Sequence, residues 1–211
     1  MVKLMTQQSI QMELNNLFPT AVARFKLGRD LTEAEYTFLS LQENRPNNGN
    51  VTSINKNILK NKECQDLKQF IEASLKEYFD TVYSPKDDLS IYITQSWVNY
   101  TKENEFHHKH NHGNSIVSGV FYINAVKDTD KIHFFRHNTD QIRLVPKDWN
   151  IYNSESWWLG AETGDLLLFP STLTHMVEKV THSEGRISLS FNTFLRGNLG
   201  DAMSLTGLTL E

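Results

Sequence analysis

Four of the eight histidines in the chain lie within six residues, in the segment "HHKHNH" from His107 to His112. Neutral imidazole is a good ligand for Fe(II), Zn(II) and similar metal ions. The segment on its own fits three descriptions: a solvated polar loop, a pH-sensitive patch, or the first half of a metal site. The rest of the sequence must decide between these three descriptions.

The spacing of these histidines limits how they could bind one ion. On extended backbone, residues two apart point to the same side of the strand. His108, His110 and His112 would therefore share a face, and His107 would point away from it. A neighbouring pair two residues apart can chelate one metal ion, whereas three in a row cannot easily all reach it.

A second polar group follows in "GDLLLFPSTLTHMVEKVTHSEGRISLSFN", residues 164–192. His175 stands after an apolar strand and a proline-containing turn, and Arg186 opens another strand eleven residues later. In that strand Arg186, Ser188 and Ser190 alternate with apolar side chains, which predicts the lining of a polar cavity inside a barrel. A surface strand is the alternative. It accounts for the serines but not for an arginine at this distance from a lone histidine.

The segments that must position these residues divide the chain into a mixed first part and a β-rich second part. Residues 20–27 read as a short strand, and Thr32 with Glu35 predicts a helix that starts with a capping box. Residues 61–83 carry apolar side chains at helical spacing, so we expect a helix packed on the core. We assign these apolar side chains no role in catalysis or ligand binding.

After Pro85 the pattern changes to short strands separated by turn-prone residues, which favours a sandwich or barrel. We predict a single domain, 1–211, of the α+β class and mainly β. It would comprise helical and mixed support over 1–85, a jelly-roll core over 86–196 and a weakly patterned tail over 197–211. The expected strands are "LSIYITQSWVNY", "SIVSGVFYINA", "KIHFFRH", "QIRLVP", "SWWLGA", "GDLLLFP" and "RISLSFNTF".

Composition narrows the classes of protein. The 211 residues can bury one sizeable core, and a formal net charge of −4 argues against non-specific nucleic-acid binding. Cys64 is the only cysteine, so no intrachain disulfide can form and an intracellular address is the natural expectation. The sequence shows no membrane span or secretory apolar core. We expect the cytoplasm, or the host cytoplasm if a phage encodes the chain.

Several of these motifs occur together in one known family. H-x-H, S-G-V-F-Y, G-D-x-x-x-F-P-x-x-x-x-H and R-x-S, flanked by "SWVNY" and "LFPTAVARF", resemble the Fe(II)- and 2-oxoglutarate-dependent oxygenases. The chain looks most like the prolyl-hydroxylase-like members from bacteria and tailed phages. The resemblance runs from about Leu17 to about Phe194. It implies a double-stranded β-helix, a cupin-like jelly-roll, with N-terminal helices packed on it and one Fe(II) that 2-oxoglutarate chelates.

The resemblance also implies roles for individual residues. His110, His112 and His175 would bind the iron, and Arg186 would pair with the far carboxylate of 2-oxoglutarate. Arginine suits this role because its planar fork matches a carboxylate with two bonds. The further candidates for the cosubstrate pocket are Ser188, Tyr122 and Asn99.

One departure from the wider superfamily leaves the second metal ligand open. Most members have H-x-D or H-x-E, where this chain has His112. Either His112 binds and the site is three neutral imidazoles, or a carboxylate such as Asp128 or Glu105 completes it. A third alternative moves the motif to His108 and His110. The spacing to Ser118 and Gly119 favours His110 and His112.

The implied reaction converts 2-oxoglutarate and O2 into succinate and CO2 while a prime substrate, a protein side chain or a small molecule, is hydroxylated. Two rivals are a cupin with zinc, nickel or manganese, which would not need Arg186, and a non-catalytic binding or virion-assembly module. A nucleobase substrate is disfavoured because no basic groove with interleaved aromatics is evident. Trp157 and Trp158 could form a substrate-facing wall, or pack in the core or in a homodimer.

Overall fold

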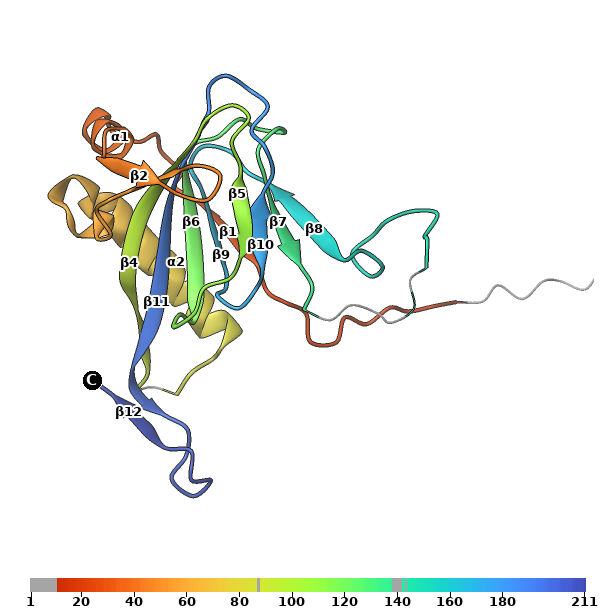
Figure 1. Cartoon of the computed structure of the whole chain (residues 1–211). Coiled ribbons are helices and arrows are strands. Elements are labelled where there is room, and N and C mark those ends of the chain that lie inside the picture. Colours follow the sequence, from red (N-terminus) through yellow and green to blue (C-terminus); the bar gives the residue numbers. More distant parts are fainter. Residues whose placement is uncertain (1–10, 87, 138–141, 143) are drawn as a thin grey trace, which may run out of the picture.

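The computed structural model describes residues 11–86, 88–137, 142 and 144–211 and consists of two β-sheets with helices on one side (Figure 1). The larger sheet has the order β1-β9-β6-β11-β4-β3-β2, with β12 paired to β11, and the smaller has the order β5-β10-β7-β8. Its strands are β1 (Ala23–Lys26), β2 (Asn44–Pro46), β3 (Val51–Ser53), β4 (Ser90–Thr101), β6 (Val117–Asn124), β9 (Asp165–Pro170), β11 (Arg186–Leu199) and β12 (Leu208–Leu210). The smaller sheet contains β5 (His107–His110), β7 (Lys131–Phe135), β8 (Ser156–Gly160) and β10 (His175–Val177).

Both faces of the larger sheet are buried, and they belong to two different cores. On one face α2 (Gln65–Val82) packs its apolar stripe, and Phe70 meets Phe121 edge to face. On the other face Tyr122 and Leu167 belong to a second core with Phe134 of the smaller sheet. This double burial explains why β6 and β9 read as nearly continuous apolar runs rather than as alternating ones.

The N-terminal part supplies strands as well as helices. The helix α1 (Glu33–Ser40) starts with the predicted capping box, in which Thr32 and Glu35 bond each other's backbone N–H groups. Two short 3-10 helices, Ile58–Lys60 and Lys62–Cys64, precede α2, so the long helix starts later than the sequence pattern predicted. β1 pairs with β9, and the hairpin β2–β3 extends the larger sheet beyond β4.

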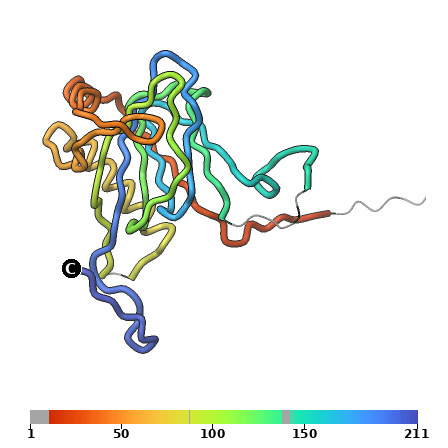
Figure 2. The backbone as a smooth tube through the Cα atoms, in the orientation of Figure 1, coloured from red at the N-terminus to blue at the C-terminus, as the bar shows by residue number. Residues whose placement is uncertain are grey.

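Two sequence expectations about the later strands change. The segment "QIRLVP" was expected to be a strand; Gln141 and Arg143 lie outside the described residues, and the rest forms no ladder. Leu144 and Val145 are exposed there and belong to no strand. The weakly patterned tail, in contrast, is ordered into a hairpin, because β11 runs on to Leu199 and β12 folds back on it. Figure 2 shows this hairpin extending away from the body.

None of the described helices is long and apolar enough to cross a membrane.

Gly119 gives a stability test of the contact between strands β6 and β11. A Cβ atom there would collide with the ring of Phe191, which is fully buried on the neighbouring strand. Gly119→Ala should lower the free energy of unfolding by about 1–3 kcal/mol, the usual range for an overpacked core. Urea denaturation measures this.

Gly160→Ala is the matched control, because it also lies in a strand and its added Cβ would meet only a backbone oxygen at 4.0 Å. It should change the free energy of unfolding by less than about 0.5 kcal/mol. Equal losses in the two variants would contradict the close packing of Phe191 on Gly119.

Candidate metal centre

The metal candidates meet where β5 pairs with β10. His110 lies opposite His175 in this antiparallel pair, and His107 lies opposite Val177. Between these two pairs the chain advances three residues on β5 but only two on β10, so the strand pair contains a β-bulge. Just beyond β5, the backbone N–H of His112 donates to the carbonyl of Ser171 at 2.9 Å, which keeps His112 beside the same strand pair.

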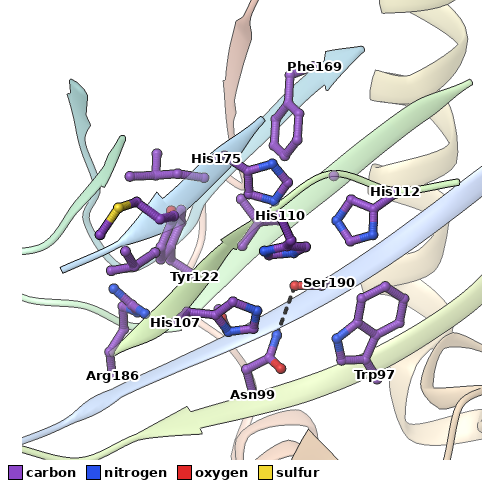
Figure 3. Close-up of a pocket in the computed structure, with 16 residues that line it drawn as sticks. Trp97, Asn99, His107, His110, His112, Tyr122, Phe169, His175, Arg186 and Ser190 are labelled. Atoms are coloured by element: carbon purple, nitrogen blue, oxygen red, sulfur yellow. Dashed lines mark hydrogen bonds between the residues drawn. The ribbon is translucent and has the colours of Figure 1, made fainter. Parts of the chain in front are cut away.

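The rings of His110, His112 and His175 form one compact cluster (Figure 3). One ligand nitrogen from each lies within 4.8 Å of the others. The ring centroid of His175 is 4.4 Å from that of His110 and 5.2 Å from that of His112. The structure therefore brings together the three histidines that the resemblance implied, from two strands and a loop.

Hydrogen bonds select the tautomer of two of these rings. Nδ1 of His110 lies 2.8 Å from the carbonyl oxygen of His108, and Nδ1 of His175 lies 2.9 Å from that of Leu173. A carbonyl oxygen only accepts, so each Nδ1 carries the hydrogen and each Nε2 presents a lone pair. This is the usual preparation of a metal-binding histidine by its neighbours.

Burial keeps the three rings neutral. It is the main cause that lowers the pKa of His112 to about 4 and that of His175 to about 3, and the pKa of His110 is also lowered. Because metal ions bind the neutral form of imidazole, the protein environment favours the ligand form of all three.

Neither proposed carboxylate belongs to the cluster. Glu105 accepts the backbone N–H of Lys102 through its side chain, and Asp128 is exposed with the positive φ of a turn. Among the residues that the structure describes, the clusters of side chains close enough to bind one metal ion contain histidines only. The arrangement therefore favours a ligand set of three imidazoles.

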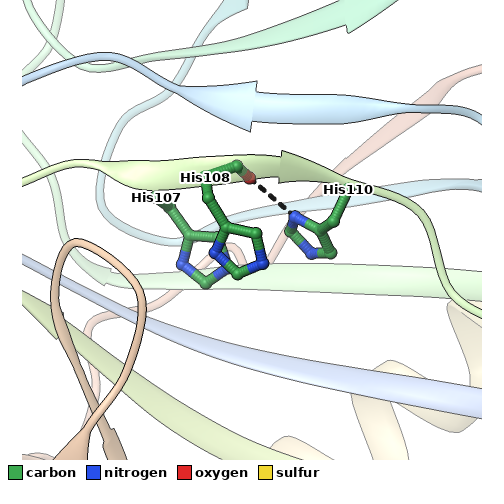
Figure 4. Close-up of side chains that lie close together, drawn as sticks. All are labelled: His107, His108 and His110. Atoms are coloured by element: carbon green, nitrogen blue, oxygen red, sulfur yellow. Dashed lines mark hydrogen bonds between the residues drawn. The ribbon is translucent and has the colours of Figure 1, made fainter.

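A second histidine group overlaps the first. Figure 4 shows that the rings of His107, His108 and His110 also lie close together, with ligand nitrogens within 4.8 Å. Nδ1 of His110 is already bonded to the carbonyl of His108, so His110 has only Nε2 to offer. The two groups are therefore alternatives for one ion rather than a pair of sites.

The expected orientation of His107 was wrong. Strict alternation turned it away from His110, whereas the structure places both in the lining of one cavity, with ring centroids 4.8 Å apart. The bulge in β5 breaks the period of two, so residues three apart share a face. Burial lowers the pKa of His107 to about 2, and the charges of nearby histidines and of Arg186 add to this.

Arg186 lines the same cavity and is 3% exposed. Its NH1 has no hydrogen-bond partner, and Oδ1 of Asp130 lies 3.9 Å away, beyond hydrogen-bond length. Its NH2 donates a long bond of 3.5 Å to Oγ1 of Thr101. Burial lowers the pKa of Arg186, as expected for a buried cation that the protein does not fully neutralise.

The remaining cosubstrate candidates lie side by side on three neighbouring strands. Ser188 of β11 is in register with Asn99 of β4 and with Tyr122 of β6, and all three line the cavity. Asn99 donates to Oγ of Ser190 at 3.0 Å, while its own Oδ1 lacks a partner. Burial raises the pKa of Tyr122 to about 12, so its hydroxyl stays a hydrogen-bond donor.

The cavity also has an aromatic wall that sequence reasoning missed. The ring of Trp97 lies 6.0 Å from that of His112. Its position two residues before Asn99 on the same strand was the available signal. Trp157 and Trp158, the residues expected to face substrate, do not line this cavity; they are 41% and 47% exposed on the edge strand β8.

The family comparison matches the segment of the chain that contains the site residues. Residues 95–192 match the family described as "Putative 2OG-Fe(II) oxygenase". That segment includes the three clustered histidines, Arg186 and the other cavity candidates. A comparison with curated proteins found no match.

Three solved structures with the same fold illustrate this likeness. An oxidoreductase of the 2OG-Fe(II) oxygenase family from Burkholderia pseudomallei is 12% identical, over 74% of each chain, with a TM-score of 0.53. HygX from Streptomyces hygroscopicus, solved with nickel and 2-oxoglutarate, is 9% identical over 82% of each chain, with a TM-score of 0.52. A prolyl-4-hydroxylase from Pseudomonas putida is 12% identical over 82% of this chain and 92% of that one, with a TM-score of 0.52. At these identities the likeness establishes the fold, the predicted double-stranded β-helix.

Metal binding tests the ligand set. Alanine at His110, His112 or His175 should weaken Co(II) binding by more than about 100-fold, because loss of even an outer-sphere partner costs 10–100-fold. Titration of the metal-free protein, followed by the visible absorption of bound Co(II), measures the affinity.

Glu105→Gln and Asp128→Asn are the controls for a carboxylate ligand. Both should bind Co(II) within about twofold of the wild type, because neither side chain belongs to the cluster. A large loss in either one, with little loss in His112→Ala, would instead support a two-histidine, one-carboxylate site.

Proposed function

Residues 95–192 match the 2OG-Fe(II) oxygenase family, and we propose that His110, His112 and His175 hold Fe(II) in this chain while Arg186 binds the far carboxylate of 2-oxoglutarate. The family activity is an oxygenase reaction that depends on Fe(II) and 2-oxoglutarate. The residue roles and the prime substrate are the parts that we propose.

The three histidines fit a divalent iron. Imidazole suits Fe(II), and three protein ligands leave coordination positions for a chelating 2-oxoacid and for O2. All three rings are neutral, so the protein adds no negative charge to the ion. The dianionic cosubstrate would supply that charge, and we therefore expect iron and 2-oxoglutarate to bind cooperatively.

The single observation that carries the cosubstrate assignment is the unpaired NH1 of Arg186. A buried guanidinium nitrogen without a partner is costly, because its desolvation is not offset by a hydrogen bond. A carboxylate placed against Arg186 would satisfy NH1 and could form a two-bond pair with the fork. A cupin that uses another metal for isomerase or hydrolase chemistry would not need this cation.

When bound, Fe(II) and 2-oxoglutarate would supply an oxidative decarboxylation in which O2 is the oxidant: one oxygen atom goes into succinate as CO2 leaves, and the other oxidises the prime substrate, usually by hydroxylation. The protein holds the reactants in place and limits the access of water. Trp97, whose ring centroid lies 6.0 Å from that of His112, is an aromatic surface of the cavity on which a substrate could lie. We propose a protein side chain or a small molecule as substrate.

Turnover tests the activity. With Fe(II), O2 and 2-oxoglutarate the protein should form succinate slowly even without a prime substrate, and His175→Ala should abolish this. Chromatography of the organic acids measures it, and mass spectrometry of host extract should reveal a product one oxygen atom heavier. If iron-loaded wild type forms no more succinate than His175→Ala, the proposed activity is wrong.

Arg186→Ala tests the cosubstrate role. It should weaken 2-oxoglutarate binding to the anaerobic Mn(II) form by about 2–5 kcal/mol, the usual cost of removing one partner of a buried charge pair. Arg186→Lys should recover only part of this, because a point charge replaces a planar fork. Calorimetric titration measures both.

Two controls make the Arg186 result specific. Pyruvate lacks the far carboxylate, so its weak binding should be insensitive to Arg186→Ala. Arg196→Ala, on the same strand but stacked over Tyr92 outside the cavity, should leave both acids unaffected. Unchanged 2-oxoglutarate affinity in Arg186→Ala would make Arg186 a structural residue.

A further inference from the structure

We propose that His107 is a second, uncharged donor to the far carboxylate of 2-oxoglutarate, and that Asn50 holds it in the tautomer that donates. The inference rests on the proposed function, because it assigns a contact to the same cosubstrate. It concerns a residue that sequence alternation turned away from the site.

The hydrogen bond at His107 is the opposite of those at the metal candidates. Nδ1 of His107 lies 3.1 Å from Nδ2 of Asn50, an amide nitrogen that only donates. Nδ1 is therefore the acceptor, and the hydrogen of the neutral ring is on Nε2. His110 and His175 have theirs on Nδ1. His107 is thus prepared to donate from Nε2, not to bind a metal ion through it.

In this orientation the Asn50 amide is hydrogen-bonded at both ends. This side chain is 5% exposed, and its Nδ2 also donates to Oγ1 of Thr101 at 3.1 Å. Its Oδ1 accepts from Nδ2 of Asn47 at 3.0 Å. Both ends of the amide are therefore used.

The β2–β3 turn that carries Asn50 is held against the start of β5. The backbone N–H of Phe106 donates to the carbonyl of Gly49 at 3.0 Å, and Nδ1 of His108 donates to the carbonyl of Asn48 at 3.3 Å. Gly49 has a φ of +92°, and a Cβ there would lie 2.7 Å from the carbonyl oxygen of Phe106. The turn can approach β5 this closely because residue 49 is glycine.

His107 and Arg186 belong to the same part of the cavity. Both line it, and Figure 3 shows the His107 ring between Arg186 and His110 in that view. Thr101 links them, since its Oγ1 accepts from Asn50, the partner of His107, and from NH2 of Arg186. A ligand that extends from the three-histidine cluster to Arg186 would therefore pass along His107.

An uncharged donor in this position has a clear use. The divalent metal and Arg186 already supply three positive charges for a dianion, so attraction is not lacking. A fixed N–H adds direction instead, because a hydrogen bond weakens steeply when its angle is wrong. It would favour a 2-oxoacid whose second carboxylate reaches Arg186, and so select 2-oxoglutarate over shorter 2-oxoacids.

The test compares variants at His107 in the anaerobic Mn(II) protein by calorimetric titration. His107→Phe should weaken 2-oxoglutarate binding about tenfold, the effect of roughly 1.4 kcal/mol expected for one hydrogen bond. His107→Gln should stay within about threefold of the wild type, because its amide nitrogen can stand in for Nε2–H. Mn(II) affinity should change less than about threefold in both variants, and pyruvate binding should not change.

Lys109→Gln is the control, because Lys109 lies on the same strand, places its ammonium over the ring of Phe135 and is not part of the cavity lining. It should leave 2-oxoglutarate affinity within about twofold. If His107→Phe loses nothing, or Gln fails to rescue it, the donor role is wrong. A loss of Mn(II) binding in both His107 variants would make His107 a metal ligand. If wild type shows no metal-dependent 2-oxoglutarate binding, the proposed function fails as well.

NMR of metal-free protein that contains 15N-labelled histidine determines the tautomer of each ring in the absence of any ligand. The signals that are missing in His107→Gln are those of His107. The spectra should show the hydrogen on Nε2 in His107 and on Nδ1 in His110 and His175. A His107 ring with its hydrogen on Nδ1 would overturn the role of Asn50.

Discussion

The pairing of His110 with His175 across β5 and β10 is the constraint on which the site depends. This register brings an H-x-H segment and a histidine 63 residues further along the chain to within one metal ion's reach. The same pair contains the bulge that turns His107 into the cavity. Each of these two histidines is also oriented by the carbonyl group of the residue two positions earlier along the chain, which is His108 on β5 for His110 and Leu173, before β10, for His175. β5, β10 and the residues that flank them therefore determine where the ligands lie and, for His110 and His175, which nitrogen each presents.

Charge is arranged around this pairing in a consistent way. The metal candidates are uncharged, and the fixed cation, Arg186, lies elsewhere in the same cavity. Behind it, Asp130 uses Oδ2 to accept from the backbone N–H of Val126 and from Nε2 of His182. Oδ1 of Asp130 stays 3.9 Å from Arg186, close enough to moderate a buried positive charge but too far to occupy its NH1. The guanidinium therefore keeps a free donor for a ligand.

The sequence was most informative where function depends on residues close together in the chain. H-x-H, the distal histidine and the alternation after Arg186 are local patterns, and the structure brings them together as the resemblance implied. It was less informative wherever a contact spans the chain. Asn50 contacts His107 because a hairpin turn packs against β5, and no sequence pattern predicts that contact. A bulge in β5 reverses the expected direction of His107. The exposed position of Trp157 on an edge strand likewise depends on the order of strands in the sheet, which the spacing of residues along one strand does not predict.

The central claim, that three neutral histidines hold the iron, is tested most directly by a crystal structure of the anaerobic Fe(II)–2-oxoglutarate complex with anomalous scattering at the iron edge. We expect one iron peak bonded to Nε2 of His110, Nε2 of His175 and a nitrogen of His112, with the 2-oxoacid completing the chelate and no protein carboxylate bound. A peak between His107, His108 and His110, or an iron bonded to a side-chain carboxylate, would contradict the account.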